Sequence, residues 1–430
     1  MRNAAAGLLV AALIFTGATI ATASSVPPTT EPSPSGTDDG VLTIGVLLPQ
    51  SRAGSWIGIP GINAAEYARN RINEVGGVLG ADLVLVRADE GATTESATAA
   101  IEALLGAGVD AVVGPASSLI ALQTLDQLMS AGVLTCSPTA SSLLLDDFPN
   151  RELFFRTIPS DSLQLAALAI RARNSGFRST VVFYRDDLYG RELAEAALGE
   201  LERQGVELAA SSGFDADDDL RAQIDLLIEH PDSTIIVLAD QSQGMRMLGE
   251  IGNAVPQFGT ETMPPIYVND AVRAATPADY LALDEAVLRA LWRLGPVSGL
   301  SVRQLEGQPP PDPVEGPGPL PPGPYALNTL DCVNLIALAA RETGTDDPQV
   351  LAAELPAVAD GGAGCSTFAQ CVALLDQNRD IDYQGPNTQN PLRQFLPDRG
   401  DLARANVMSY QVDLETGVDE EGQPINTELD

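Results

Sequence analysis

The feature that most constrains the fold is a regular alternation of short apolar runs with amphipathic stretches across residues 41–290. Runs such as LTIGVLL, STVVFY and STIIVLA are rich in aliphatic and β-branched residues, which is typical of buried strands. One of the intervening stretches has an apolar stripe at helical spacing, formed by Ala97, Ala100, Ile101, Leu104 and Leu105. Alternating strands and helices predict an α/β fold with parallel sheets that are covered by helices on both faces.

The alternation begins anew after residues 156–162, so two sets of about equal length follow each other. A Pro- and Gly-rich segment interrupts the pattern, and a strong helix, ALNTLDCVNLIALAAR, comes after it. The remaining C-terminal part is too small for a domain, so we expect the chain to return and complete both earlier lobes. The predicted lobes are 41–159 with 295–395 and 160–294 with 396–430.

The N-terminus has the pattern of an export signal. Arg2 precedes an apolar run, and Ala21 and Ala23 are small residues at a potential cleavage site, so residues 1–23 predict a cleavable signal peptide. An uncleaved membrane anchor is the alternative, because the run nearly reaches the length of a membrane span. Residues 24–40 are rich in Pro, Ser and Thr and predict a disordered tether. We therefore expect an exported protein, periplasmic or extracellular.

Charge and composition exclude several classes of function. Asp and Glu number 58 against 24 basic residues, all of them Arg, and this acidic surface disfavours nucleic acid as a partner. Without Lys the chain has no phosphate-binding GxxxxGK[ST] loop and no Schiff base. His230 is the only His, so an HExxH zinc site is excluded and a catalytic triad would depend on that residue. We expect no enzymatic activity, no cofactor and no metal.

Four cysteines in an exported chain favour disulfides over a metal site. Cys365 and Cys371 are six positions apart and form the expected local pair, which leaves Cys136 and Cys332 for a long-range pair. Four cysteines allow three pairings, so this connectivity is a hypothesis.

Six short segments in a fixed order resemble one known family. They are IGVLLP near the start, INEVGG at 72–77, GPASS at 114–118, CSPTASS at 136–142, FFRTIPSD at 154–161 and YRDDLYGRELA at 184–194. Together they are similar to the type I periplasmic binding proteins, in the branched-chain amino-acid and amide-binding branch that serves ABC importers. The resemblance is good over 41–270. It implies two Rossmann-like lobes with parallel sheets, joined by a three-crossover hinge, with the ligand held in the cleft between them.

The predicted carboxylate-binding groups lie at the carboxyl ends of strands, where α/β sheets bind ligands. Ser117 begins a helix, whose free N–H groups favour an anion, and it matches the family's carboxylate-binding serine. The segment Thr139, Ala140 and Ser141 matches the family's second contact loop. The alternatives are a simple helix N-cap for the first and an ordinary polar turn for the second.

Other site predictions come from the second half of the resemblance. Asp270, after the strand PIYV, matches the family's acidic partner of the ligand ammonium, and Tyr189 matches an aromatic contact. Trp56 lies next to another aromatic contact position. Asp240 stands where relatives commonly have an aromatic residue, and an unpaired carboxylate there would suit a polar or cationic ligand side chain better than leucine.

The sequence therefore predicts an exported, monomeric solute-binding protein of an ABC importer. Its partners would be a small ligand, an amino acid or related polar solute, and the importer's permease subunits. Closure of the lobes would couple to binding, because contacts from both lobes exist together only in the closed form. The alternative is a sensor of the same fold that signals to a membrane partner without transport.

Overall fold

The computed structural model describes most of the chain beyond the predicted tether. The described residues are 39–51, 54–149, 151–258, 263–274, 276–296, 323, 325–386, 394–396 and 400–428. The predicted signal at 1–23 and all but the last two residues of the tether at 24–40 lie outside them. Among the described helices, none is both long enough and apolar enough to cross a bilayer.

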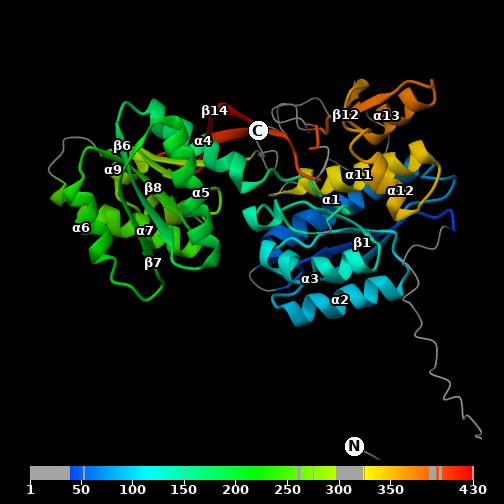
Figure 1. Ribbon diagram of the computed structural model, residues 1–430, viewed down its shortest axis with the longest axis horizontal. Coiled ribbons are helices and arrows are strands. Elements are labelled where there is room, and N and C mark those ends of the chain that lie inside the picture. The colour runs from blue at the N-terminus through cyan, green and yellow to red at the C-terminus, as the bar shows by residue number, and fades with distance from the viewer. Residues whose placement is uncertain are drawn as a thin grey trace, which may run out of the picture. The chain divides into compact units, whose positions relative to one another are not determined.

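The first sheet has five parallel strands in the order β2-β1-β3-β4-β5 (Figure 1). They are β1 Thr43–Leu48, β2 Val84–Asp89, β3 Ala111–Val113, β4 Leu134–Ser137 and β5 Phe154–Arg156. The helices between them are α1 Ser55–Glu74, α2 Thr94–Gly106 and α3 Ser118–Ser130, with the short 3-10 helix η2 Leu143–Leu145 before β5. The central strands are buried on both faces, as expected for a parallel sheet covered by helices.

Helix α2 shows how the sequence pattern becomes structure. Thr93 caps it, because its side chain accepts from the Ser96 N–H while the Ser96 hydroxyl oxygen accepts from the Thr93 N–H. Within the predicted apolar stripe, Ala97, Ile101 and Leu104 are buried, whereas the other two residues are only partly buried. The stripe thus faces the sheet and places α2 against it.

The second sheet has seven strands in the order β14-β13-β10-β9-β8-β6-β7. They are β6 Ser179–Arg185, β7 Glu207–Phe214, β8 Ser233–Leu238, β9 Ile266–Val268, β10 Leu291–Pro296, β13 Arg404–Val412 and β14 Asp419–Glu428. The helices of this part are α4 Asp161–Asn174, α5 Leu188–Gln204, α6 Arg221–Glu229, α7 Gln241–Ala254, α8 Pro277–Leu281 and α9 Glu285–Ala290, with the 3-10 helix η3 Val255–Gln257. Strands β6 to β10 are parallel, but β13 is antiparallel to both β10 and β14. The expectation of purely parallel sheets therefore misses this hairpin, whose short turn can join only antiparallel neighbours.

The C-terminal third packs on the first sheet and adds strands to the second. Helix α11 (Ala326–Thr343) is almost entirely buried and packs on α1 beside the first sheet, together with α12 (Pro348–Glu354) and α13 (Phe368–Leu375) (Figure 1). A small sheet of β11 (Ala363–Cys365) and β12 (Ile381–Tyr383) follows, and the chain then enters β13 of the second sheet. The chain passes between the two sheets after β5, after β10 and after β12, which gives the three crossovers of a type I fold.

Two disulfides fix this part of the chain. Cys136 at β4 is bonded to Cys332 in α11, across 196 positions of sequence, and Cys365 is bonded to Cys371. These are the two predicted pairs.

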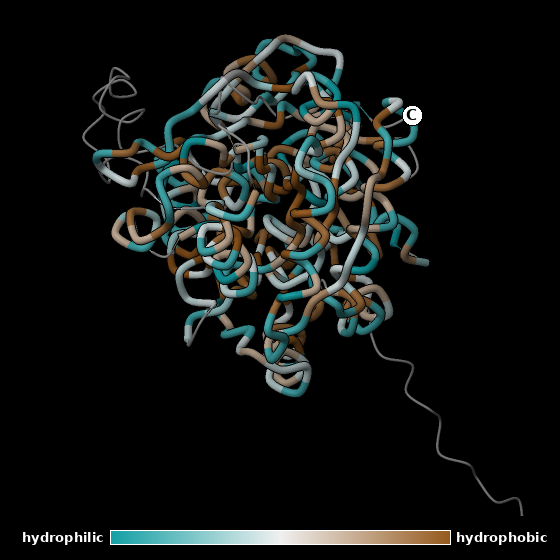
Figure 2. The backbone as a smooth tube through the Cα atoms, turned by 90° about the vertical axis from the view of Figure 1, so that its left-hand side faces the viewer, coloured by the Kyte–Doolittle hydropathy of each residue, from teal (hydrophilic) through white to brown (hydrophobic). Residues whose placement is uncertain are grey.

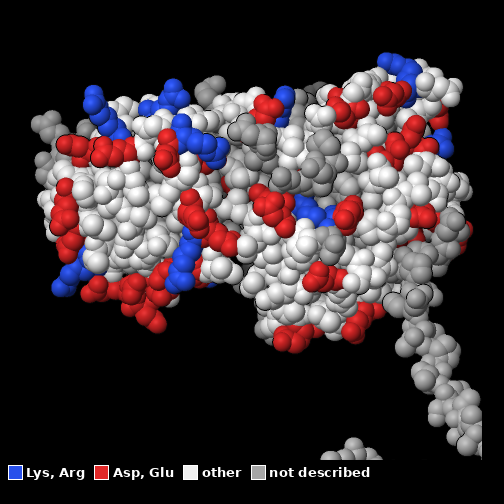
Figure 3. Space-filling view, viewed as in Figure 1, with Lys and Arg blue, Asp and Glu red and all other residues white. Residues whose placement is uncertain are grey.

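Figure 2 shows the hydrophobic segments concentrated inside the molecule and the hydrophilic ones toward its surface. Acidic side chains are spread over the face seen in Figure 3, many of them near arginines.

Candidate functional site

A small cavity lies where strand ends of both sheets meet the crossovers. Its lining residues are Thr139, Ser141, Ile158, Pro159, Ser160, Asp161, Gln164, Asp270, Tyr325 and Val407. The first two follow β4, the next three form the crossover after β5, and the following two begin α4. Asp270 follows β9, at the carboxyl end of a parallel strand of the second sheet. This is the edge at which open α/β sheets bind ligands.

Asp161 is the more deeply buried of the two carboxylates in this cavity, with 3% of its surface exposed. It is the first residue of α4, and Ser160 caps that helix. Its N–H donates to the Ser141 carbonyl oxygen at 2.9 Å, which joins two walls of the cavity. The Tyr189 hydroxyl donates to Asp161 Oδ2 at 3.1 Å. Asp161 is thus held by the Ser141 loop through its backbone and by Tyr189 of α5 through its carboxylate.

Asp270 faces the same cavity from β9. The Tyr325 hydroxyl donates to its Oδ2 at 3.0 Å, and Arg273 Nε donates to its backbone carbonyl at 3.2 Å. The neighbouring strand β10 passes so close that a Cβ atom on Gly295 would lie 2.4 Å from Cβ of Asp270. Glycine at position 295 therefore leaves room for the side chain at position 270.

The electrostatics of the cavity are one-sided. Burial first, and then the nearby Asp270 charge, raise the pKa of Asp161 to about 7, although hydrogen bonds from Ser141 and Tyr189 act in the opposite direction. Burial raises the pKa of the Tyr189 and Tyr325 hydroxyls, and so do the carboxylates of Asp161 and Asp270 for Tyr189 and that of Asp270 for Tyr325, so both hydroxyls stay neutral donors. No basic residue is among the described residues that line the cavity. A cation in the cavity would relieve the repulsion between the two acids.

Three of the predicted site residues, Thr139, Ser141 and Asp270, line the cavity together. Tyr189 stands one contact away, through its hydrogen bond to Asp161. Ala140 is buried between the two lining residues of its loop, and its N–H donates to Ser137 Oγ at 3.0 Å.

Trp56 lies beside the cavity. Its ring centroid is 6.5 Å from that of Tyr325, and the Arg273 guanidinium carbon is 5.4 Å from the Trp56 ring. The indole is 44% exposed. The structure therefore places Trp56 next to a lining residue, and direct contact with a ligand stays a prediction.

Ser117 does not line the cavity and acts as the N-cap of α3. Its N–H donates to Glu90 Oε1 at 2.9 Å, and the Ala116 N–H donates to Glu90 Oε2 at 2.7 Å. The amide that the sequence assigned to a ligand carboxylate thus already has a carboxylate of the chain as its acceptor. Burial raises the pKa of this Glu90 side chain to about 7. A carboxylate-binding role for Ser117 stays a prediction.

Asp240 also lies outside the lining of the cavity. It caps α7, accepting from the Gln243 N–H at 3.0 Å, and forms an ion pair with Arg185 at 2.5 Å. Arg185 provides a counter-charge to this carboxylate, and direct contact of Asp240 with a ligand stays a prediction. Asp240 therefore gives no reason to exclude an apolar ligand side chain. The lining of the cavity also includes the apolar residues Ile158, Pro159 and Val407.

Sequence reasoning missed Asp161, Gln164 and Tyr325 as lining residues. Asp161 ends the segment FFRTIPSD, which supplied part of the family resemblance, and its place at a helix start was an available signal. Tyr325 follows a Pro- and Gly-rich segment, which gave no such signal. Within the described part of the chain, no group of three or more His, Cys, Asp or Glu is placed to hold a metal ion.

Comparison with known proteins gives the family and the fold. Residues 41–252 match the family model described as periplasmic binding protein. The chain belongs to the type I periplasmic binding proteins. Its relatives lie in the branched-chain amino-acid branch of that family, which is a family of solute-binding proteins and not an enzyme class.

The relatives differ in how much of the chain they cover. A Leu/Ile/Val-binding protein from Rhizobium johnstonii is 32% identical over 169 residues, which make up 38% of this chain and 45% of the relative. A homologous Leu/Ile/Val-binding protein from Brucella melitensis is 30% identical over 168 residues, again 38% of this chain and 45% of the relative. The crystal structure of a leucine-binding protein from Thermotoga maritima has 18% sequence identity and a TM-score of 0.64, over 90% of this chain and 99% of that chain. The binding protein thus matches less than half the length of these sequence relatives, whereas the likeness of fold extends over most of the chain.

Proposed function

We propose that this binding protein is the exported solute receptor of an ABC importer and captures an amino acid or a similar small solute that carries an ammonium group. Closure of the two lobes around the cavity would accompany binding. The observation that supports this proposal is the pair of carboxylates, Asp161 and Asp270, that share a cavity whose described lining residues include no basic group.

The physical reason lies in the cost of buried charge. Two acids in one small site disfavour each other's ionised form, and an ammonium group between them replaces that repulsion with attraction. Each hydrogen bond to a charged group contributes roughly 1.5–3 kcal/mol. Asp161 begins α4, which packs on the second sheet, and Asp270 follows β9 of that sheet, whereas the Thr139–Ser141 loop follows β4 of the first sheet. A ligand can contact the two acids and this loop together only when the two parts of the molecule are close. This geometry couples ligand capture to the closed arrangement.

The proposed delivery of the ligand to an importer rests on the similarity of the chain to known binding proteins. The sequence relatives are Leu/Ile/Val-binding proteins, and the chain shares their family. We extend this role to the present chain, with permease subunits as its membrane partner and a monomer as its soluble form. The ligand side chain would contact Ile158, Pro159 and Val407, which are the apolar part of the lining.

A comparison of three related compounds tests the proposed recognition. L-Leucine and isopentylamine both carry the ammonium group, whereas 4-methylpentanoate keeps only the carboxylate and the side chain. We expect the first two to raise the melting temperature of the protein and 4-methylpentanoate to leave it unchanged, because specific binding stabilises the folded state by mass action. A wider panel of amino acids, amides and polyamines, measured in the same way, would then identify the preferred side chain. A thermal shift with 4-methylpentanoate and none with any amine would contradict the proposal.

The raised pKa of Asp161 predicts a pH dependence of ligand binding. Its value of about 7 means that the carboxyl group is protonated below that pH in the ligand-free protein. An ammonium ligand binds the ionised form, so protons compete with it, and affinity should fall by up to about tenfold per pH unit as the pH drops below 7. Calorimetric titration with L-leucine between pH 5 and 8 measures this slope, and proton release at pH 6 appears as a dependence of the heat on the buffer.

The variant Asp161→Asn is the control for this assignment. It keeps the shape of the side chain but has no proton to lose, so its affinity, although weaker, should vary little over the same pH range. A slope that persists in this variant would assign the titration to another group, with Glu90 the first candidate because its pKa is also raised to about 7.

A further inference from the structure

A buried arginine beside the cavity contacts several of the segments that form it. Arg156, the last residue of β5, has 0% of its surface exposed. Its Nη1 donates to the carbonyl oxygens of Ala140 at 3.3 Å and Ser142 at 3.1 Å. These two carbonyls flank Ser141 in sequence, and Ser141 lines the cavity. One side of the guanidinium therefore holds the loop that forms the first wall.

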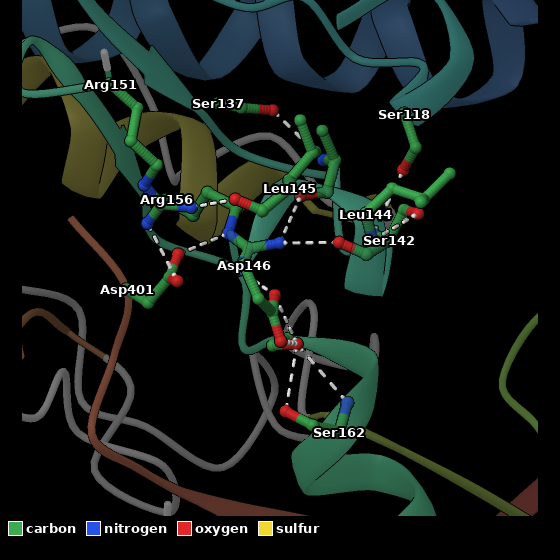
Figure 4. Close-up of polar contacts among 12 residues, drawn as sticks. Ser118, Ser137, Ser142, Leu144, Leu145, Asp146, Arg151, Arg156, Ser162 and Asp401 are labelled. Atoms are coloured by element: carbon green, nitrogen blue, oxygen red, sulfur yellow. Dashed lines mark hydrogen bonds and ion pairs between the residues drawn. The ribbon is translucent and has the colours of Figure 1, made fainter. Parts of the chain in front are cut away.

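The second side of the guanidinium reaches the opposite wall through a carboxylate. Arg156 Nη2 is 2.6 Å from Asp146 Oδ1, and both oxygens of Asp146 accept from the Ser160 hydroxyl at 2.9 Å (Figure 4). Ser160 caps α4, the helix that begins with Asp161. A chain of two hydrogen bonds thus connects Arg156 to the start of the helix that carries the buried acid of the cavity.

The third contact of the Arg156 guanidinium is with Asp401, on the crossover before β13. Arg156 Nε donates to Asp401 Oδ1 at 2.6 Å, and the Arg156 N–H donates to the Gly400 carbonyl oxygen at 2.8 Å. Asp401 lies shortly before β13, on the last crossover, and also forms an ion pair with Arg151 at 2.7 Å. One side chain therefore contacts the Ser141 loop and the crossover before β13, and it reaches the crossover after β5 through Asp146.

These contacts are strong because the group is buried and fully paired. Burial alone would lower the pKa of the Arg156 guanidinium, but the Asp401 and Asp146 carboxylates outweigh it and raise that pKa, so the charge is kept. Only the planar fork of arginine can reach acceptors in several directions at once, and lysine has a single ammonium point charge.

We propose that Arg156 is a positioning residue of the cavity, which holds the Ser141 wall and the Asp161 wall against each other and ties both to the crossover at Asp401. Its importance for ligand capture rests on the proposed function, whereas its effect on the order of the two walls does not. The proposal can therefore be tested on the protein without any ligand.

Amide hydrogen exchange of the full chain, free of ligand, gives that test. In Arg156→Lys the charge remains but the contacts to the loop and to Asp146 are lost. We expect exchange in segments 139–146 and 157–164 to become about tenfold faster or more, as the loss of a hydrogen bond to a charged group implies. Exchange in the central strand β8 (233–238) should stay unchanged, because local opening does not require global unfolding.

Arg151→Lys is the matched control. It is the same substitution at a buried arginine that pairs with the same Asp401, but Arg151 has no hydrogen bond to the Ser141 loop or to Asp146 among those of the described residues. Its Nη1 donates to the Leu145 carbonyl oxygen inside segment 139–146, so the comparison is made on segment 157–164, which should stay unchanged in this variant. If Arg156→Lys does not fold, Asp146→Asn replaces it, and then segment 157–164 should show the larger change.

Two results would overturn the proposal. Equal acceleration in β8 and in the two wall segments would mean that Arg156 only stabilises the whole fold. Unchanged exchange in both segments, or the same acceleration of segment 157–164 in Arg151→Lys, would mean that the walls do not depend on this side chain. Each of these results concerns the ligand-free protein, so it is distinguishable from a failure of the proposed function, which appears as an absence of amine binding.

Discussion

Replacing Asp270 by alanine is expected to weaken the binding of L-leucine or another ammonium-bearing ligand by about 10- to 100-fold. The substitution removes one of the two carboxylates that face the cavity, and a hydrogen bond to a charged group contributes roughly 1.5–3 kcal/mol, with about 1.4 kcal/mol for each factor of ten. The fold should survive, because alanine adds no atoms next to Gly295, where the approach is closest. Isothermal titration calorimetry measures the affinity, and the melting temperature without ligand reports on the fold.

Asp240→Ala is the matched control for this experiment. Asp240 also follows a parallel strand of the second sheet, but it pairs with Arg185 outside the lining of the cavity. We expect its ligand affinity to equal that of the wild type. An unchanged affinity in Asp270→Ala, or a larger loss of affinity in Asp240→Ala than in Asp270→Ala, would show that Asp270 is not the main partner of the ligand ammonium. The pair of variants therefore separates the two acids that the sequence offered as ligand contacts.

The sequence predicts the parallel core of the fold because short local patterns indicate each of its strands and helices. The strands LTIGVLL and STIIVLA are apolar throughout, and the α2 stripe has helical spacing, so each element can be found without its neighbours. Strand β14 has no such pattern. Its sequence DEEGQPINTE is mostly polar and contains both Gly422 and Pro424, and it becomes a strand by pairing with β13. Such pairing is a tertiary effect that periodicity does not reveal.

The residues of the site also fall into those that the sequence indicated and those whose contacts only the structure shows. Thr139, Ser141 and Asp270 were found because they match contact positions of the family that the sequence resembles. Each also lies a few residues after a parallel strand, and such strands bring their carboxyl ends to one edge of the sheet. Glu90 follows β2 by the same rule, but its bonds to Ala116 and Ser117 depend on how two loops meet in space. The Arg156 contacts join residues as far apart as 245 positions in sequence. Contacts of this kind need the structure, because no local spacing encodes them.

Removing the disulfide between Cys136 and Cys332 should have the largest effect on stability. The bond closes a loop of 196 positions, and the loop-entropy relation for the unfolded chain gives about 5 kcal/mol for a loop of this size. Both cysteines are fully buried, so the double variant Cys136→Ala/Cys332→Ala also loses packing between β4 and α11. Urea unfolding without reductant, followed by circular dichroism, measures the loss in the free energy of unfolding.

The second disulfide provides the comparison within the same chain. Cys365 and Cys371 are only six positions apart, so the same relation gives about 2 kcal/mol for Cys365→Ala/Cys371→Ala. The expected difference of about 3 kcal/mol comes from loop length, because both variants remove two buried sulfur atoms. An equal loss in the two variants would show that chain entropy does not govern the long-range bond. The described residues that line the cavity include no cysteine, so ligand affinity should be unchanged in both variants under conditions where they are folded. The experiment therefore separates the effect of the disulfides on stability from the role of Asp161 and Asp270 in binding.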